Sequence, residues 1–163
     1  MEESRKQKKS LTPFEAKRKA ESYCAYQERA QQEVRNKLYE WGLHQEEVEN
    51  IIAQLIEDNF LNEERFAKAY TLGKFRMKGW GKIKIKQHLK AKNVSDPLIR
   101  LALKEISEEE YYKKIEETVK KKIKKPIPNI SFTEKSKLYT YLQSKGFEND
   151  IIYNIINTKQ SFL

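Results

Sequence analysis

The chain has 163 residues, of which 35% are charged and only 38% apolar, and its net charge is +9. Several small cores in an elongated arrangement fit this composition better than one large spherical core. No run of about 18 apolar residues occurs, and the N-terminus lacks the apolar region of a secretory signal, so we expect a cytoplasmic protein without a membrane partner.

Residue types that support catalysis or metal binding are sparse. Cys24 is the single cysteine, which excludes an intrachain disulfide, and no Cys/His cluster has the spacing of metal ligands. We interpret Cys24 as a small apolar core residue and the two histidines, His44 and His88, as isolated surface residues. The glycine cluster Gly79-Trp-Gly81 lacks the Gly-Lys-Ser/Thr ending of a phosphate loop. We therefore expect no catalytic residues, no metal, no cofactor and no enzymatic activity.

At the start of the chain, residues 1–11 are charged and without apolar anchors, so a disordered tail is expected. A helix is predicted over about 13–26, because Thr12 and Glu15 fit a capping box and Pro13 occupies the first helical position. Two further helices of this kind are predicted over about 62–78 and 108–124.

Each of these three helices is followed by a repeated pattern of apolar positions. The pattern predicts a helix that ends at Gly or Asn, a tight turn, and a second helix with apolar residues at i, i+3 and i+4. The matched sets are Val34, Ile85 and Leu138; Leu38, Leu89 and Leu142; Gly42, Asn93 and Gly146; Leu43, Val94 and Phe147; Val48, Ile99 and Ile152; Ile51, Ala102 and Ile155; and Ile52, Leu103 and Ile156.

The sequence therefore predicts an all-α fold of nine helices. They form three tandem three-helix units, similar to helix-turn-helix motifs, in an elongated, curved arrangement. The predicted repeats cover 12–59, 60–106 and 107–163, and the second is basic. Residues 82–86 alternate as a strand would, but we interpret them as helical because the window is short and the repeat requires a helix there.

Charge is distributed unevenly along the chain. Residues 65–104 hold 12 basic side chains and one acidic one, whereas residues 21–64 hold three basic and 11 acidic ones. A basic stretch without acidic residues is typical of polyanion binding, because each cation beside a phosphate displaces a counterion. The predicted binding residues are Lys74, Arg76, Lys78, Lys82, Lys84, Lys86, Lys90 and Lys92.

Three features of the charged segments bear on what the protein could bind. Trp80, in the middle of the basic stretch, can stack on a base, or it can be a core anchor below a solvated lysine face. A second basic run, 120–125, precedes Pro126 and is equally compatible with a binding role and with a helix end. Recognition of a specific base sequence is disfavoured, because the predicted helix at 45–58 is strongly acidic.

Three segments resemble signatures of the RecX family of recombination regulators. Phe60-Leu-Asn-Glu-Glu-Arg-Phe-Ala-Lys-Ala-Tyr70 is similar to GYLDDERFAxxY. Arg76-Met-Lys-Gly79-Trp-Gly81, followed by Ile85 and Leu89, is similar to RxxxGxGxxxIxxxL, and Leu142-Gln-Ser-Lys-Gly146-Phe147 with Ile152 to LxxRGFxxxxI. The resemblance extends from about residue 12 to 159. Asn62-Glu63, Val94 and Lys145 depart from the family pattern without removing a chemical group of known role.

The resemblance implies three tandem three-helix repeats and a role in DNA recombination, DNA repair and the SOS response. The implied partners are the RecA recombinase filament and single-stranded DNA, with weaker contacts to double-stranded DNA. The implied effect is mainly inhibition of the filament's ATPase, strand-exchange and co-protease activities. We expect a monomer whose basic stretch faces DNA or an acidic filament surface. The alternative is a general nucleic-acid-binding helical protein that acts through DNA contacts alone.

Overall fold

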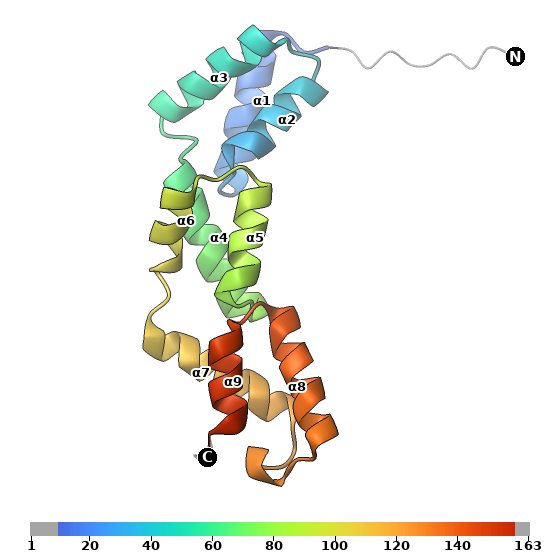
Figure 1. Cartoon of the computed structure of the whole chain (residues 1–163). Coiled ribbons are helices and arrows are strands. Elements are labelled where there is room, and N and C mark those ends of the chain that lie inside the picture. The colour runs from blue at the N-terminus through green and yellow to red at the C-terminus, as the bar shows by residue number, and fades with distance from the viewer. Residues whose placement is uncertain (1–9, 159–163) are drawn as a thin grey trace, which may run out of the picture. The chain divides into compact units, whose positions relative to one another are not determined.

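The computed structural model describes residues 10–158, and within them the fold is all-α, as predicted, without a β-strand (Figure 1). The elements are α1 (Pro13–Tyr26), α2 (Gln31–Glu40), α3 (Gln45–Glu57), α4 (Glu63–Lys78), α5 (Lys82–Ala91), α6 (Asp96–Leu103), α7 (Glu108–Lys122), the 3-10 turn η1 (Ile127–Asn129), α8 (Phe132–Lys145) and α9 (Asn149–Asn157). The helix predicted over 108–124 ends earlier, because Ile123 turns to extended backbone before the prolines. The alternating residues 82–86 are helical, which confirms that interpretation.

Local capping determines where the helices begin and end. The hydroxyls of Thr12, Ser107 and Ser131 accept hydrogen bonds from backbone N–H groups three residues later, at 3.1–3.2 Å. These bonds satisfy backbone donors that the first helical turn leaves without an intrahelical acceptor. At the helix ends, Gly42, Asn93 and Gly146 have φ values of 89°, 60° and 92°, which confirms the predicted left-handed caps.

Backbone contacts divide the chain into two compact units. Unit 1 contains the described residues up to Phe66 together with Lys92–Val94, and unit 2 contains Ala67–Ala91 together with the described residues from Ser95 onward. Most of the second predicted repeat therefore packs in one unit with the third.

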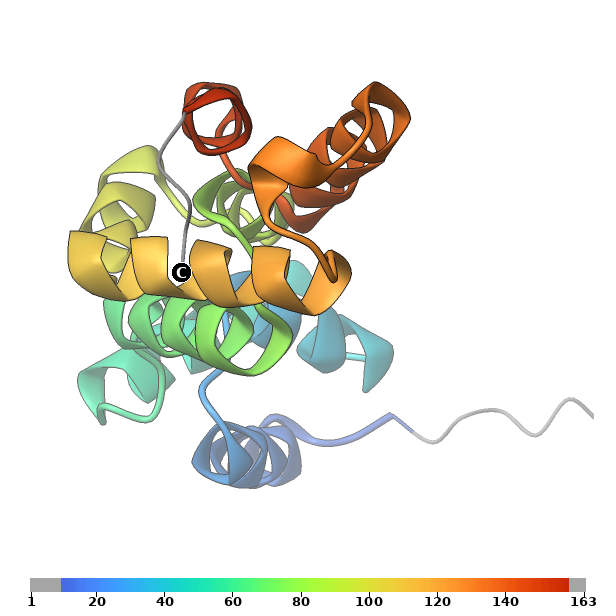
Figure 2. The ribbon, with the colours of Figure 1, turned by 90° about the horizontal axis from the view of Figure 1, so that it is seen from below.

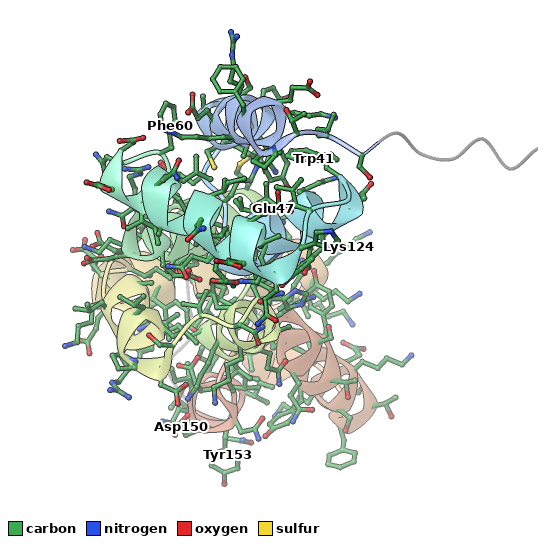
Figure 3. All side chains as sticks on the ribbon, turned by 90° about the horizontal axis from the view of Figure 1, so that it is seen from above. Trp41, Glu47, Phe60, Lys124, Asp150 and Tyr153 are labelled. Atoms are coloured by element: carbon green, nitrogen blue, oxygen red, sulfur yellow. The ribbon has the colours of Figure 1, made fainter. Side chains whose placement is uncertain are left out.

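The core of unit 1 lies between α1, α2 and α3. Its buried residues are Ala16, Ala20, Cys24, Val34, Leu38, Leu43, Val48, Ile51, Ile52, Leu55 and Leu61. Trp41 and Phe60 pack against this core from positions just after α2 and α3 (Figure 3). Leu11 also packs there, and its N–H donates to the Trp41 carbonyl at 3.0 Å. Of the predicted tail, residues 1–9 lie outside the described residues.

Cys24 is buried in this core, which confirms its interpretation as an apolar core residue. Burial disfavours the thiolate and raises the pKa of Cys24 to about 11 from 9.0. At pH 8 the thiolate fraction is then about 100-fold lower than for a thiol of pKa 9.0. We expect native protein to react with a thiol reagent at least about 100-fold more slowly than urea-unfolded protein. Equal labelling rates for native and unfolded protein would show that the thiol is accessible.

In unit 2, the buried Tyr111 ring lies between two other aromatic rings. Its ring centroid is 5.9 Å from that of Phe75 on α4 and 5.7 Å from that of Phe147 in the α8–α9 turn. Figure 2 shows α7, which carries Tyr111, between α4 on one side and α8 and α9 on the other. Through Tyr111, α7 therefore connects the α4 segment of unit 2 to the turn between α8 and α9.

The start of α5 meets the end of α8 backbone to backbone. Gly81 N–H donates to the Lys145 carbonyl at 2.7 Å, and Ile83 N–H donates to the Gly146 carbonyl at 3.0 Å. Between them, Lys82 N–H donates to the Tyr111 hydroxyl at 3.0 Å. The unpaired donors of one helix start are thereby satisfied by acceptors from α7 and from the end of α8. This contact fixes the α4–α5 corner, where the basic stretch lies (Figure 1).

Candidate nucleic-acid interface

Trp80 organises the strongest grouping of cations and aromatic rings in the basic stretch. Its ring centroid lies 4.4 Å from that of His88 on α5 and 6.5 Å from that of Tyr70 on α4. The ammonium groups of Lys74 and Lys84 lie 5.1 and 4.7 Å from the Trp80 ring centroid. We call these five residues the Trp80 cluster.

Helix spacing and the α4–α5 corner bring this cluster together. Tyr70 and Lys74 are one turn apart on α4, as Lys84 and His88 are on α5. Gly79 ends α4 with a φ of 67°, and the corner places Trp80 between the two helices. Trp80 is half-buried, so it is neither a fully buried core anchor nor a free surface ring. His88 is exposed, as predicted for a surface histidine, but it is not isolated, because its ring packs on Trp80.

Such a cluster has the chemistry of a single-strand platform. Aromatic rings can stack on bases of any sequence, and neighbouring ammonium groups can pair with backbone phosphates. In the unbound protein the lysines are held near the ring by cation–π attraction. When nucleic acid binds, the ammonium groups of Lys74 and Lys84 can therefore leave the Trp80 ring and pair with a phosphate.

Three of the predicted cations are ion-paired. Arg76 Nε lies 2.9 Å from Glu110 on α7, and Lys90 Nζ lies 3.6 Å from Asp96. The Arg76–Glu110 hydrogen bond raises the pKa of Arg76 and lowers that of Glu110. Lys92 belongs to unit 1, where its ammonium pairs with Glu33 on α2. These pairs reduce the positive charge that the three side chains offer to a polyanion.

The remaining three predicted cations differ in what surrounds them. Lys82 places its ammonium 4.7 Å from the Tyr111 ring centroid. Lys78 and Lys86 are exposed, and neither side chain forms an ion pair with any residue in the described part of the chain. Lys82, Lys84 and Lys86 all project from α5 and carry no carboxylate partner among residues 10–158.

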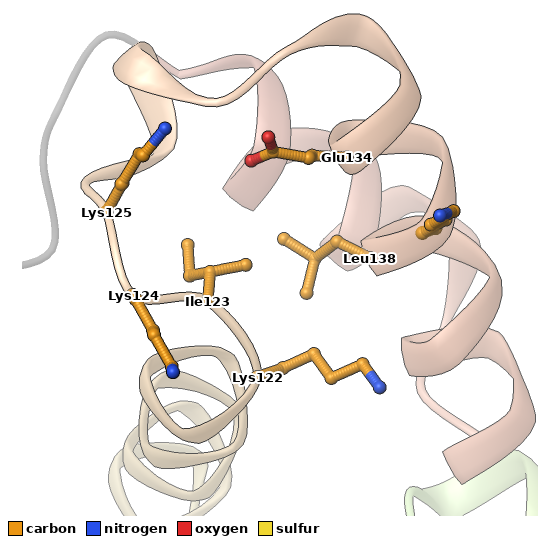
Figure 4. Close-up of a pocket in the computed structure, with 7 residues that line it drawn as sticks. Lys122, Ile123, Lys124, Lys125, Glu134 and Leu138 are labelled. Carbon is orange, nitrogen blue, oxygen red and sulfur yellow. The ribbon is translucent and has the colours of Figure 1, made fainter.

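The second basic run borders a separate pocket. This pocket has a volume of about 270 Å³ and lies between the end of α7 and α8 (Figure 4). Ile123 and Leu138 point toward each other across it, and lysines surround them. The lining residues are Lys122, Ile123, Lys124, Lys125, Glu134, Lys137 and Leu138.

Two further findings concern metal ligands and membrane-spanning helices. No group of three or more His, Cys, Asp or Glu side chains between residues 10 and 158 is arranged to hold a metal ion. No helix in that range combines the length and apolar character that crossing a membrane requires.

Comparison with known proteins gives a consistent relationship over most of the chain. Residues 16–55, 62–103 and 108–156 match the first, second and third three-helix domains of RecX, in this order. The chain is 30% identical to the Regulatory protein RecX of Haemophilus influenzae (strain PittGG) over 142 residues, which cover 84% of this chain and 90% of that protein. It is 33% identical to the Regulatory protein RecX of Clostridium perfringens over 130 residues, which cover 78% of this chain but 60% of that protein.

A solved structure has the same fold. The crystal structure of RecX from Lactobacillus salivarius matches with a TM-score of 0.78 and 26% identity, and the match covers 88% of this chain and 94% of that one. The match supports the prediction of three three-helix domains, which was based on the repeat pattern.

Proposed function

The chain belongs to the RecX family, and from this premise we propose that it binds the RecA recombinase filament on single-stranded DNA. Binding would mainly inhibit the filament's ATPase, strand-exchange and co-protease activities, and so act in recombination, repair and the SOS response. The relatives are named regulatory proteins. We also propose that the protein is monomeric and cytoplasmic, needs no cofactor and catalyses no reaction of its own.

The observation that carries the proposal is the matched series of three domains, with the basic stretch in the second. A filament offers the same surface many times along its length. Several weak contacts from successive domains then combine through effective concentration, without a tight contact at any one of them. Within this scheme, Lys82, Lys84 and Lys86 on α5 face DNA or an acidic filament surface.

A second candidate is a single-strand-binding protein whose effect on recombination is indirect. The Trp80 cluster favours it, because aromatic rings beside lysines suit single strands without any protein partner. The two candidates differ in how much protein is needed, relative to DNA, to inhibit the recombinase. Competition for DNA requires enough protein to cover the DNA, whereas a filament regulator acts when it is scarce.

We expect Lys82→Glu/Lys84→Glu/Lys86→Glu to abolish inhibition of the cognate recombinase, because three attractive charges become repulsive. The measurement is single-stranded-DNA-dependent ATP hydrolysis, titrated with each protein in excess DNA. The wild-type protein should inhibit at substoichiometric amounts.

The matched control is Lys104→Glu/Lys113→Glu/Lys135→Glu, which makes the same change in net charge outside α5. This control should inhibit nearly as well as the wild type. Full inhibition by the α5 variant would contradict the assignment of α5. Inhibition that disappears merely on adding DNA would favour the second candidate.

A further inference from the structure

A second cationic site lies at the C-terminal end of α4, and the sequence run did not indicate it. Here a pocket of about 180 Å³ is lined by side chains of α4, α7 and α8. Its five cations are Arg76, Lys78, Lys114, Lys121 and Lys145. Glu117 is the one carboxylate among its lining residues. We call it the α4-end pocket.

Helix register brings these side chains together. On α7, Lys114, Glu117, Thr118 and Lys121 follow the i, i+3, i+4, i+7 spacing of a single helix face. An adjacent face of α7 carries the buried Tyr111, Ile115 and Val119, which hold the helix in place. On α8, Tyr141 and Lys145 are one turn apart. The pocket is thus formed mainly by three packed helices.

Lys114 and Lys145 also cap the end of α4, but this structural role does not account for all of the positive charge in the pocket. Lys114 Nζ donates to the Arg76 carbonyl, and Lys145 Nζ donates to the Lys78 carbonyl, each at 3.4 Å. Cations at a helix C-terminus are favourable, since they neutralise its carbonyls. However, an ammonium group has three donors, so each lysine keeps donors for another acceptor.

The other cations leave the pocket with an excess of positive charge. Lys78 and Lys121 form no ion pair with any residue that the structure describes, and Arg76 shares one carboxylate, Glu110. Like charges that line one pocket repel each other, and a bound anion relieves that repulsion.

The chemistry of the pocket favours a phosphate rather than a base. Lys122 and Lys145 place their ammonium groups 4.5 and 5.8 Å from the Tyr141 ring centroid, so cations already occupy the neighbourhood of this ring. Phosphate oxygens accept charge-assisted hydrogen bonds from several cations at once. Lys78 is only two residues from Trp80, so the pocket adjoins the corner that carries the Trp80 cluster.

We propose that the α4-end pocket binds a backbone phosphate of single-stranded nucleic acid while the Trp80 cluster stacks on a neighbouring base. The inference rests on the proposed function in taking a single strand as ligand. It adds Lys114, Lys121 and Lys145 from the third repeat to the binding residues.

The test compares two double variants that remove the same charge. Lys78→Gln/Lys121→Gln empties the pocket of two cations without touching the lysines that cap α4, and Lys104→Gln/Lys113→Gln is the control outside the pocket. Binding of a fluorescent 12-nucleotide oligo(dT) is measured by anisotropy over a series of salt concentrations. We expect the pocket variant to bind about fivefold more weakly, with a salt slope shallower by roughly 0.7 for each phosphate that the protein no longer neutralises. An abasic oligonucleotide of equal length should show the same fold-reduction in affinity.

Equal weakening in both double variants would overturn the proposal, since general electrostatics would then suffice. A second result would also overturn it. In that result the pocket variant binds the oligonucleotide as tightly as the wild type, and pyrophosphate raises the melting temperature of the wild type but not that of the variant. That outcome would assign the pocket to a small phosphorylated ligand. The assay contains no recombinase, so its result is independent of whether the protein regulates filaments.

Discussion

Gly81→Ala is expected to lower the free energy of unfolding by about 2–4 kcal/mol. A Cβ at Gly81 would overlap the carbonyl of Gly146 and the backbone nitrogen of Phe147. These are backbone atoms, so relief requires that the start of α5 move away from the end of α8. That movement would also break the hydrogen bond from Gly81 N–H to the Lys145 carbonyl. Urea unfolding, followed by circular dichroism, measures the change in stability.

The matched control for this substitution is Gly73→Ala, in the middle of α4. Apart from its chain neighbours and the nearby backbone of its own helix, no atom lies within 4 Å of the position that its Cβ would take, and its φ is not positive. Alanine there should stabilise the protein by about 0.5–1 kcal/mol, because glycine is costly inside a helix. If Gly81→Ala unfolded at the wild-type urea concentration, the backbone contact between α5 and α8 would be refuted.

Tyr111→Phe should cost about 1–3 kcal/mol, although the ring itself is retained. The hydroxyl donates to Glu148 at 2.5 Å and accepts from Lys82 N–H at 3.0 Å. Phenylalanine leaves both groups without that partner, while the ring contacts with Phe75 and Phe147 remain. Burial and the Glu148 carboxylate both raise the pKa of Tyr111, so the hydroxyl stays protonated and able to donate at neutral pH.

The neighbouring Tyr112 provides the comparison, because its side chain is exposed. Tyr112→Phe removes the same oxygen and should change the free energy of unfolding by less than about 0.5 kcal/mol. Identical urea midpoints for the two variants would show that the Tyr111 hydroxyl does not hold α5 to α7 and α9.

The helices could be predicted because the residues that start and end each helix act on backbone close to them in sequence. Capping residues such as Thr12 and Ser107 act within one turn of the chain, and Gly42, Asn93 and Gly146 adopt the left-handed conformation where each helix ends. Apolar positions that recur at helical spacing then indicated the repeat. The backbone contact of Gly81 with Gly146 could not be predicted in this way, because 64 intervening residues separate its partners.

The candidate site was predicted as a run of cations, but a run does not show which way each side chain points. The structure places Lys74 and Lys84 beside Trp80, whereas Lys92 pairs with Glu33 in unit 1. Lys114 and Lys145 were missed, because their approach to the end of α4 depends on tertiary packing. The spacing of Lys114 and Lys121 on one face of α7 was the available signal.

Filament binding is the central claim, and co-sedimentation tests it most directly. Preassembled recombinase filaments on single-stranded DNA are sedimented with this protein, and the same DNA on beads without recombinase is the comparison at equal salt. We predict that the protein enters the filament pellet at concentrations where bare DNA retains little of it, and that Lys82→Glu/Lys84→Glu/Lys86→Glu does not. Equal retention by filaments and by bare DNA would contradict filament recognition, because DNA contacts alone would then account for binding.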